Sequence, residues 1–169
     1  MGDPTLKIVI MIALALVQLF FAVNGVAISP EDTFRMVSAS EILTKIYNGD
    51  PVEYDHIEIK GNLILKAQSS PNVIGSSIKI TNSKIIGEFN FENSIFRKKI
   101  NFSHSLFSGS HISFENSSFR KSISFNGAEL CGFANFKYSI FENAASFDKA
   151  KFNYIADFSE SNFMGNANF

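Results

Sequence analysis

The feature that most constrains the fold is a row of large apolar residues, nearly all phenylalanine, that recurs at alternating intervals of five and six residues. One interval is longer, near Ser110 and His111. Such an alternation drifts around a 3.6-residue helix and would scatter the rings over its surface, so it argues against a long amphipathic helix. The row, which we predict to be the structural core column, is Phe91, Phe96, Phe102, Phe107, Phe114, Phe119, Phe125, Leu130, Phe136, Phe141, Phe147, Phe152, Phe158, Phe163 and Phe169.

A second row of small or apolar residues stands two positions before each of these, as Ile123 stands before Phe125. Residues two apart in an extended chain share a face, so each such pair points inward and the residue between them points outward. Ser124 and Asn135 occupy outward positions of this kind. Only a chain that turns a corner after each short strand keeps all the pairs inside, which predicts a parallel β-solenoid.

The same phase extends upstream of the regular row. It includes Ile80 and Ile85, and it reappears earlier as Tyr54, Ile59 and Leu65. Residues 67–77 break the phase and are rich in Ser, Asn, Pro and Gly, so we expect them to form a loop that leaves the solenoid. The predicted organisation is a first irregular coil and loop over residues 52–77 and the regular repeat over residues 78–169.

Four tripeptides give the repeat a family resemblance: Ala134-Asn135-Phe136, Ala145-Ser146-Phe147, Ala156-Asp157-Phe158 and Ala167-Asn168-Phe169. They resemble the core of the pentapeptide-repeat family, in a five-plus-six variant similar to archaeal exported members. The resemblance is strong over residues 78–169 and weaker over residues 52–65. It implies an all-β fold, a right-handed parallel (quadrilateral) β-helix with one pentapeptide per side. The inserted sixth residue lengthens each coil, and the phenylalanines of successive coils are expected to stack into one continuous column.

The sequence of the N-terminus predicts a targeting segment. Residues 6–23 are almost continuously apolar, and the small residues Gly25 and Ala27 follow. This pattern favours a signal peptide over residues 1–27, cleaved after Ala27. The alternative is an uncleaved membrane anchor, because the run approaches the ~20 residues that span a bilayer. Either interpretation predicts an extracellular or cell-surface protein, with membrane contact only through residues 6–27 if they are retained.

A short helix is predicted within residues 28–51. Ser38 and Glu41 form a capping box, apolar residues follow at helical spacing, and Asn48-Gly49 is suited to end the helix. We expect a helix over residues 39–47 that covers the open end of the first coil, since an uncovered end exposes rings and unpaired strand edges.

Candidate chemical groups are few. His56, His104 and His111 could form a weak metal site, but no carboxylate or thiol stands at ligand spacing, and we expect surface histidines. The carboxylate pairs that could in principle act as acid and base are Asp148 with Asp157 and Glu115 with Glu142. Carboxylates on the outside of a β-helix are ordinarily solvated, so the prediction is no catalytic, cofactor-binding or metal-binding residue.

Three other residues could be modified. Cys131 is the only cysteine, which excludes an internal disulfide, and it is interpreted as a bystander or a point of intermolecular crosslinking. Asn101-Phe102-Ser103 and Asn116-Ser117-Ser118 match the N-glycosylation acceptor pattern, which coincidence explains at least as well in a chain rich in Asn and Ser.

Charge separates the remaining function classes. The whole chain has a formal charge of -1, and the region from Glu88 to Phe169 carries eight acidic and eight basic residues. A nucleic-acid binder would show a basic stripe, so we do not expect nucleic acid as a partner of this neutral chain. Inhibition of a DNA-binding enzyme by DNA mimicry, known in acidic members of the family, is disfavoured by this neutrality and by the export signal. The sequence favours a non-enzymatic structural or binding scaffold with an unknown partner, either a protein or a cell-surface polymer.

The sequence ends on the inward phenylalanine of a repeat, Phe169, and no capping helix follows it. An open coil presents unpaired strand edges and aromatic surface. We therefore expect either a homodimer through the C-terminal coil or a longer gene product of which this chain is a fragment.

Overall fold

The computed structural model describes residues 33–66 and 71–169, and Phe34–Phe169 form one compact unit. The signal peptide or anchor predicted over residues 1–27 lies outside the described residues. Within them, no helix is long and apolar enough to cross a bilayer.

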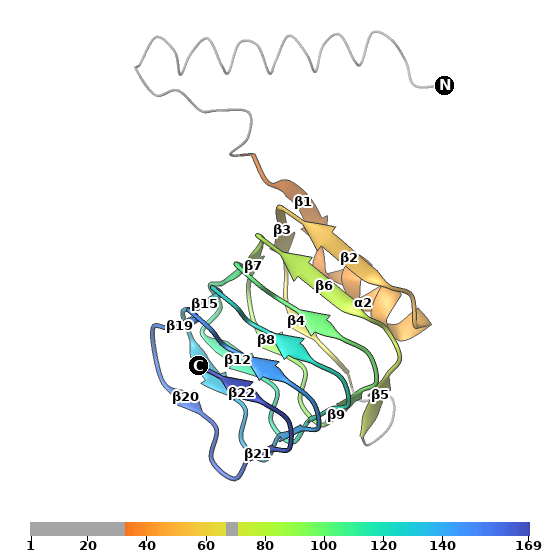
Figure 1. Ribbon diagram of the computed structural model, residues 1–169. Coiled ribbons are helices and arrows are strands. Elements are labelled where there is room, and N and C mark those ends of the chain that lie inside the picture. The colour runs from red at the N-terminus through yellow and green to blue at the C-terminus, as the bar shows by residue number, and fades with distance from the viewer. Residues whose placement is uncertain (1–32, 67–70) are drawn as a thin grey trace, which may run out of the picture. The chain divides into compact units, whose positions relative to one another are not determined.

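Four parallel sheets form the sides of a β-solenoid of about six turns (Figure 1). Sheet A contains β1 Arg35–Ser38, β3 Ile57–Lys60, β7 Lys84–Ile86, β11 Leu106–Phe107, β15 Glu129–Leu130 and β19 Lys151–Phe152. Sheet B contains β2 Val52–Asp55, β6 Ile78–Thr81, β10 Ile100–Asn101, β14 Ile123–Ser124, β18 Ala145–Ser146 and β22 Ala167–Asn168. Sheet C contains β4 Leu63–Ile64, β8 Phe89–Asn90, β12 His111–Ser113, β16 Phe133–Asn135 and β20 Ala156–Asp157. Sheet D contains β5 Asn72–Ile74, β9 Ser94–Phe96, β13 Ser118–Phe119, β17 Ile140–Phe141 and β21 Asn162–Phe163.

The chain visits the sheets in the repeating order B, A, C, D, so each coil contributes one strand to each side. Ile123 pairs with Ala145, and Ala145 pairs with Ala167, at the coil length of about 22 residues. Phe89 pairs with Ile112, one residue further along, because the extra residue near Ser110 lies at the corner between sheets A and C. The predicted fold class, a mostly β solenoid with one short helix near its start, is confirmed.

The buried rings form several stacks instead of the single column that we predicted. Phe119 stacks on Phe141 with ring centroids 4.9 Å apart, and Phe136 stacks on Phe158 at 4.8 Å. Both partners of each stack lie on the same side of neighbouring coils. The reason is that a coil contains four inward phenylalanine positions, one per side, so a ring meets its stacking partner one whole coil later. Rings from opposite sides of the solenoid, sheets C and B, meet edge-on, as Phe136 and Phe147 do at 5.6 Å.

Burial along the predicted core column falls off in the last coil. The residues from Phe91 to Phe147 in that row are all at most 2% exposed. Phe152, Phe158 and Phe163 are only partly buried, and Phe169 is 66% exposed although its ring stacks on Phe147 at 5.1 Å. The upstream members of the phase, Ile80, Ile85, Tyr54, Ile59 and Leu65, are buried as well.

Serine hydroxyls bind the coils together inside the corners. Ser105, Ser117 and Ser139 each follow a residue with positive φ and point inward, fully buried. Their hydroxyls donate to a carbonyl of the preceding coil, as Ser117 does to Phe91 at 3.0 Å and Ser139 to Phe114 at 2.7 Å. Because every such hydroxyl has a partner, these polar side chains stabilise an otherwise apolar interior.

The helix α2, Ala39–Asn48, lies beside the first coil (Figure 1). Its apolar face buries Ile42 and Ile46, the Ser38 hydroxyl accepts from the Glu41 amide, and Gly49 ends the helix at φ 78°. The Glu41 carboxylate does not complete a capping box but accepts a hydrogen bond from the Tyr54 hydroxyl at 2.5 Å. The helix ends at Asn48, one residue later than we predicted. The hydrogen bond between Glu41 and Tyr54 joins its first turn to β2.

Two segments differ from the sequence-based prediction. The loop predicted over residues 67–77 is wrong for Asn72–Ile74, which form β5 and pair with β9. Residues 67–70 lie outside the described residues. Strand β1 was not predicted at all; it pairs with β3 and extends sheet A beyond the first coil.

Candidate functional site

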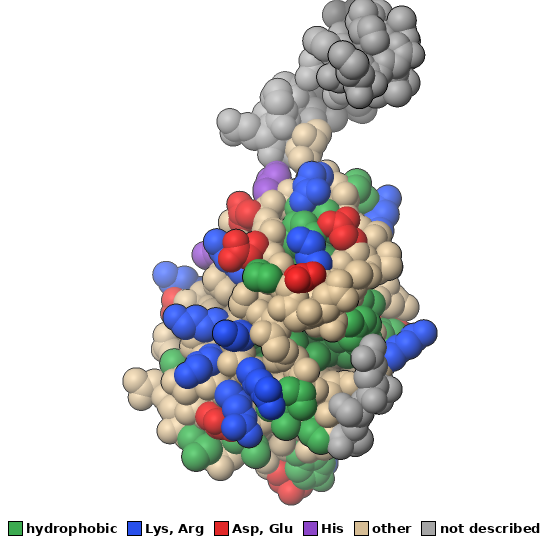
Figure 2. Space-filling view, turned by 90° about the vertical axis from the view of Figure 1, so that its right-hand side faces the viewer, with side chains coloured by type: hydrophobic (Ala, Val, Ile, Leu, Met, Phe, Trp, Pro, Cys, Tyr) green, Lys and Arg blue, Asp and Glu red, His purple; other side chains and the backbone are tan. Residues whose placement is uncertain are grey.

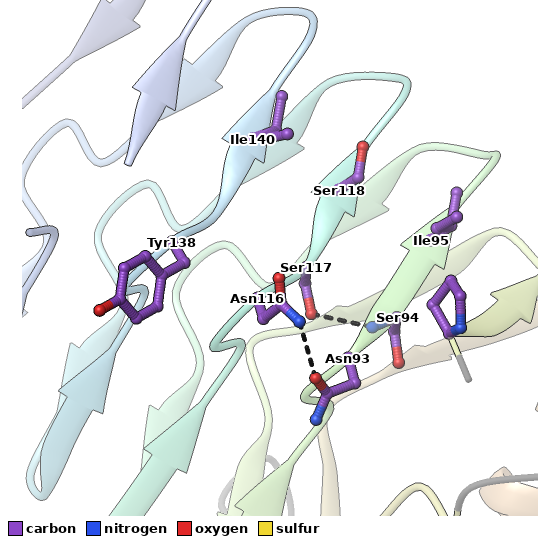
Figure 3. A pocket seen from close by; sticks show the side chains of 9 residues that line it. Asn93, Ser94, Ile95, Asn116, Ser117, Ser118, Tyr138 and Ile140 are labelled. Atoms are coloured by element: carbon purple, nitrogen blue, oxygen red, sulfur yellow. Dashed lines mark hydrogen bonds between the residues drawn. The ribbon is translucent and has the colours of Figure 1, made fainter. Parts of the chain in front are cut away.

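The outer face of sheet D carries a shallow, open groove of about 320 Å³. It is lined by Pro71, Asn93, Ser94, Ile95, Asn116, Ser117, Ser118, Tyr138 and Ile140. These residues come from the strands of sheet D and from the corner that precedes them (Figure 3). The groove is therefore lined by equivalent positions of successive coils, unlike a pocket assembled from unrelated loops.

The corner between sheets C and D forms one wall of the groove. Asn93, Asn116, Tyr138 and Glu160 occupy equivalent positions in successive coils, all with φ between 51° and 59°. Asparagine is common in this left-handed region because its side chain tolerates it, whereas a tyrosine there is unusual. The Asn116 amide donates to the Asn93 side-chain oxygen at 2.8 Å, which aligns the two amides along the wall (Figure 3).

Tyr138 continues this wall with an aromatic ring that is 42% exposed. The Lys137 ammonium lies 4.7 Å from the ring centroid, and hydrogen bonding to the Tyr138 side chain raises the pKa of Lys137. A bulky side chain in a left-handed turn is a candidate for function because the backbone strain must be offset by the surrounding structure. The ring is a flat apolar surface at the edge of the groove.

The floor of the groove is the outward row of sheet D. Val73 pairs with Ile95, and Ser118 lies between Ile95 and Ile140 in the same ladder. Ile140 is 40% exposed, and Val73, in the same ladder beyond the lining residues, is 47% exposed, so this row presents aliphatic surface interrupted by a hydroxyl. Figure 3 shows Ile95, Ser118 and Ile140 side by side on three adjacent strands.

A basic cluster lies at the other end of the sheet D strands, at the corner with sheet B. We define it as Arg97, Lys98, Lys99, Arg120 and Lys121, all exposed. Arg97 is two residues beyond Ile95, so it shares the outer face with the groove floor. Figure 2 shows lysine and arginine side chains gathered beside hydrophobic ones on this side of the molecule.

One carboxylate balances part of the basic cluster. Glu142 lies 3.5 Å from the Arg120 guanidinium and also accepts from the Ser118 hydroxyl at 3.3 Å. Among the described residues, the other four cations of the cluster have no carboxylate within ion-pair distance. The region from Glu88 to Phe169 is neutral as a whole, but this corner is locally positive.

The three histidines lie at separate places. His56 and His104 are at the corner between sheets B and A, two coils apart with Asn82 between them. His56 stacks on Phe34 at 4.2 Å, whereas His111 lies on β12 of sheet C, 3.7 Å from Glu92. Within the described residues, no three His, Cys, Asp or Glu side chains are grouped as metal ligands.

The carboxylate pairs considered from the sequence lie on different sides of the coil. Asp148 follows a strand of sheet B and Asp157 is in sheet C, where hydrogen bonds from Ser159 lower its pKa and favour the ionised form. Glu115 accepts from the Asn135 amide at 2.8 Å beside sheet C, whereas Glu142 pairs with Arg120 beside sheet D. Neither pair faces a common groove.

The remaining candidates are occupied in local contacts. Cys131 is free and half-buried, and its sulfur accepts from the Asn153 amide at 3.6 Å. The Asn101 side-chain oxygen accepts from both the amide and the hydroxyl of Ser103, and Asn116 is the corner residue that donates to Asn93.

Sequence reasoning placed the inward residues but did not find the groove. The signal was available in the spacing of Asn93, Asn116 and Tyr138, which are one coil apart and precede inward serines. Comparisons with protein-family models, curated proteins and solved structures returned no match.

Proposed function

We propose that this chain is an exported pentapeptide-repeat protein that acts as a non-enzymatic scaffold and binds a partner through the outer face of sheet D. The observation that carries the proposal is the groove on that face, whose wall and floor positions recur over successive coils beside a basic cluster that Glu142 balances only in part. Repeat proteins use extended surfaces of this kind for binding, since neighbouring repeats present the same positions in line.

Rigidity supports a scaffold role. The groove wall is held by the Asn116–Asn93 hydrogen bond, and the Ser94 amide beneath it donates to the Ser117 hydroxyl at 3.2 Å. Directly below lie Phe96 and Phe119, whose rings stack at 5.2 Å. A binding surface that is ordered before the partner arrives loses little conformational entropy on binding.

The test compares the sheet D face with the sheet A face of the solenoid. Labelled protein would be incubated with intact envelopes of the producing cell, together with variants that each change one outward row. We expect Ile95→Asp and Tyr138→Asn, both on the sheet D face, to reduce retention, and the matched sheet A variant Ile86→Asp to leave it unchanged. Equal retention of all variants, or turnover of an envelope polymer by the pure protein, would contradict the proposal.

Export is tested separately at the N-terminus. Residues 6–23 followed by Gly25 and Ala27 favour cleavage after Ala27, so mass spectrometry of protein from an export-competent host should find a chain that begins at Ile28. An intact Met1 in the membrane fraction would instead indicate an anchored protein. Recovery of the intact chain inside the cell would contradict export.

A further inference from the structure

We infer that the ligand of the sheet D groove is a linear acidic polysaccharide that lies along the solenoid axis, with its sugars over the groove and its acid groups at the basic cluster. This inference rests on the binding function proposed above and adds the chemical class of the ligand. Three features of the face carry it: the direction of the repeat, the polar and aromatic lining, and the position of the cations.

The groove runs across the strands, along the stacking direction of the coils. Three strands of sheet D line the groove, and the equivalent outward positions continue from Val73 to Asn162 over all five strands, about 20 Å at the ~4.8 Å strand spacing. A linear chain of pyranose rings advances per sugar by a length comparable to this strand spacing, so successive sugars can meet equivalent positions of successive coils. The repeat of the protein therefore matches a polymer that is itself a repeat.

The lining suits sugar hydroxyls and ring faces. The wall offers the amides of Asn93 and Asn116, and the floor offers the Ser118 hydroxyl, all of which can exchange hydrogen bonds with hydroxyl groups. Tyr138 supplies an exposed ring against which the apolar face of a sugar can pack. The aliphatic side chains of Ile95 and Ile140 complete a surface that is partly apolar and partly polar, as a sugar is.

The cations lie beside the groove. This is the position that a polysaccharide with acid groups along one edge requires. Arg97 directly follows β9, the strand of Ile95, and Arg120 directly follows β13, the strand of Ser118. A guanidinium recognises a carboxylate or sulfate through paired hydrogen bonds, while Lys98, Lys99 and Lys121 add charge around it. The nearby Glu142 already pairs with Arg120, so an acidic ligand would compete with it or bind mainly at Arg97.

An extended acidic peptide fits this face less well. Peptides that add to a sheet gain affinity from main-chain hydrogen bonds at an open edge. Here the main chain is already paired between coils, as the Arg97 amide is to the Ile74 carbonyl at 3.0 Å and the Ile140 amide is to the Ser117 carbonyl at 2.8 Å. Single-stranded nucleic acid prefers several stacked aromatic rings, whereas among the residues that line this groove Tyr138 is the one aromatic.

The experiment measures binding of the full chain, as the host exports it, to four probes: a galacturonate oligomer, neutral dextran, single-stranded DNA, and phosphatidylglycerol vesicles. Fluorescence anisotropy or co-sedimentation at low and physiological salt gives the affinities. We expect the galacturonate oligomer to bind most tightly, its affinity to fall as salt rises, and dextran to bind weakly at any salt.

Two charge-matched triple variants separate the basic cluster from general charge. R97Q/K98Q/K99Q should weaken galacturonate binding by about tenfold or more, whereas K60Q/K66Q/K151Q, which removes three exposed lysines elsewhere, should leave it unchanged. Y138N keeps a residue that tolerates the left-handed turn and removes only the ring, so weaker binding without a lower melting temperature would assign the ring to the ligand.

Equal losses from the two triple variants, no galacturonate binding, or tighter binding of the DNA or the vesicles would overturn the inference. These outcomes are distinguishable from failure of the binding function itself. If galacturonate does not bind but Ile95→Asp and Tyr138→Asn still reduce retention on cell envelopes, the face binds a partner of another class.

Discussion

Each buried phenylalanine is in contact with rings of the neighbouring coils as well as with rings of its own coil. Phe125, for example, stacks on Phe147 at 5.5 Å and meets Phe136 edge-on at 5.7 Å. Both stacked and edge-on pairs are favourable arrangements of aromatic quadrupoles. Removal of one ring therefore leaves a cavity that three or more other rings border, and the stacked coils have little freedom to collapse into it.

The first prediction at this scale concerns that cavity. Phe125→Ala and Phe147→Ala remove rings that are at most 2% exposed, and each should lower the free energy of unfolding by about 3–5 kcal/mol. Lys121→Ala, a change at an exposed lysine in the corner before β14, should lower it by less than about 0.5 kcal/mol. Chemical denaturation measures all three, and similar losses would contradict the inward assignment of the rings.

The second residue-scale prediction contrasts two adjacent serines. Ser117 is buried, donates to the Phe91 carbonyl and accepts from the Ser94 amide, whereas its neighbour Ser118 points outward. Ser117→Ala leaves both buried partners unpaired, so we expect a loss of about 1–3 kcal/mol. Ser118→Ala should cost markedly less in the same denaturation experiment. A larger loss at Ser118 would show that the inward serines do not join the coils.

At the scale of elements, the phase of the repeat predicted the strands because burial follows directly from spacing. Tyr54, Ile59 and Leu65 were placed inward from phase alone, and the structure buries all three. Strand β5 was missed because the interval between Leu65 and Ile74 is lengthened, so the phase is interrupted although the side of the coil is still formed. Strand β1 was missed because its pairing with β3 depends on a non-local contact without a periodic signal.

Apolar character did not reveal the groove, whose signal in the sequence is the one-coil spacing of Asn93, Asn116 and Tyr138. Inward positions are recognised by their apolar character, which recurs along the chain. The surface that an outward residue helps to form depends instead on its neighbours one coil away. Asn93 and Asn116 are 23 residues apart and form a hydrogen bond only because the coils stack in that register. The left-handed conformation of Tyr138 is likewise a property of the corner and not of its residue type.

The third prediction tests the end of helix α2 with two glycines in open space. A methyl group added at Gly49 or Gly75 would meet nothing within 4 Å, but Gly49 has a φ of 78° and Gly75 does not have a positive φ. Gly49→Ala should therefore destabilise the protein by about 1–2 kcal/mol through backbone strain alone. Gly75→Ala should be neutral or slightly stabilising, since it restricts the unfolded chain. Equal melting temperatures for the two variants would contradict this account of the helix end.

For the whole molecule, the last coil of the described structure differs from the others in its exposure. Strands β19, β20, β21 and β22 each pair with a neighbour on one side only. Tyr154, Ile155, Met164 and Phe169 are all more than half exposed, and Phe158 and Phe163 are only partly buried. Unpaired strand edges beside apolar side chains favour pairing with further strands, either from a second copy of the chain or from a longer gene product.

The fourth prediction is that two copies of the chain associate through this coil. A two-fold contact presents the same edge from both copies, pairs the edges antiparallel and closes, so it yields a dimer and not a fibre. Sedimentation equilibrium should detect a dimer that Phe169→Asp converts to a monomer, because the carboxylate would be buried beside the Phe147 ring. Ile86→Asp, an equally polar change on sheet A three strands away from β19, should leave the dimer intact. A native chain that stays monomeric at high concentration would show that the last coil does not bind a second copy.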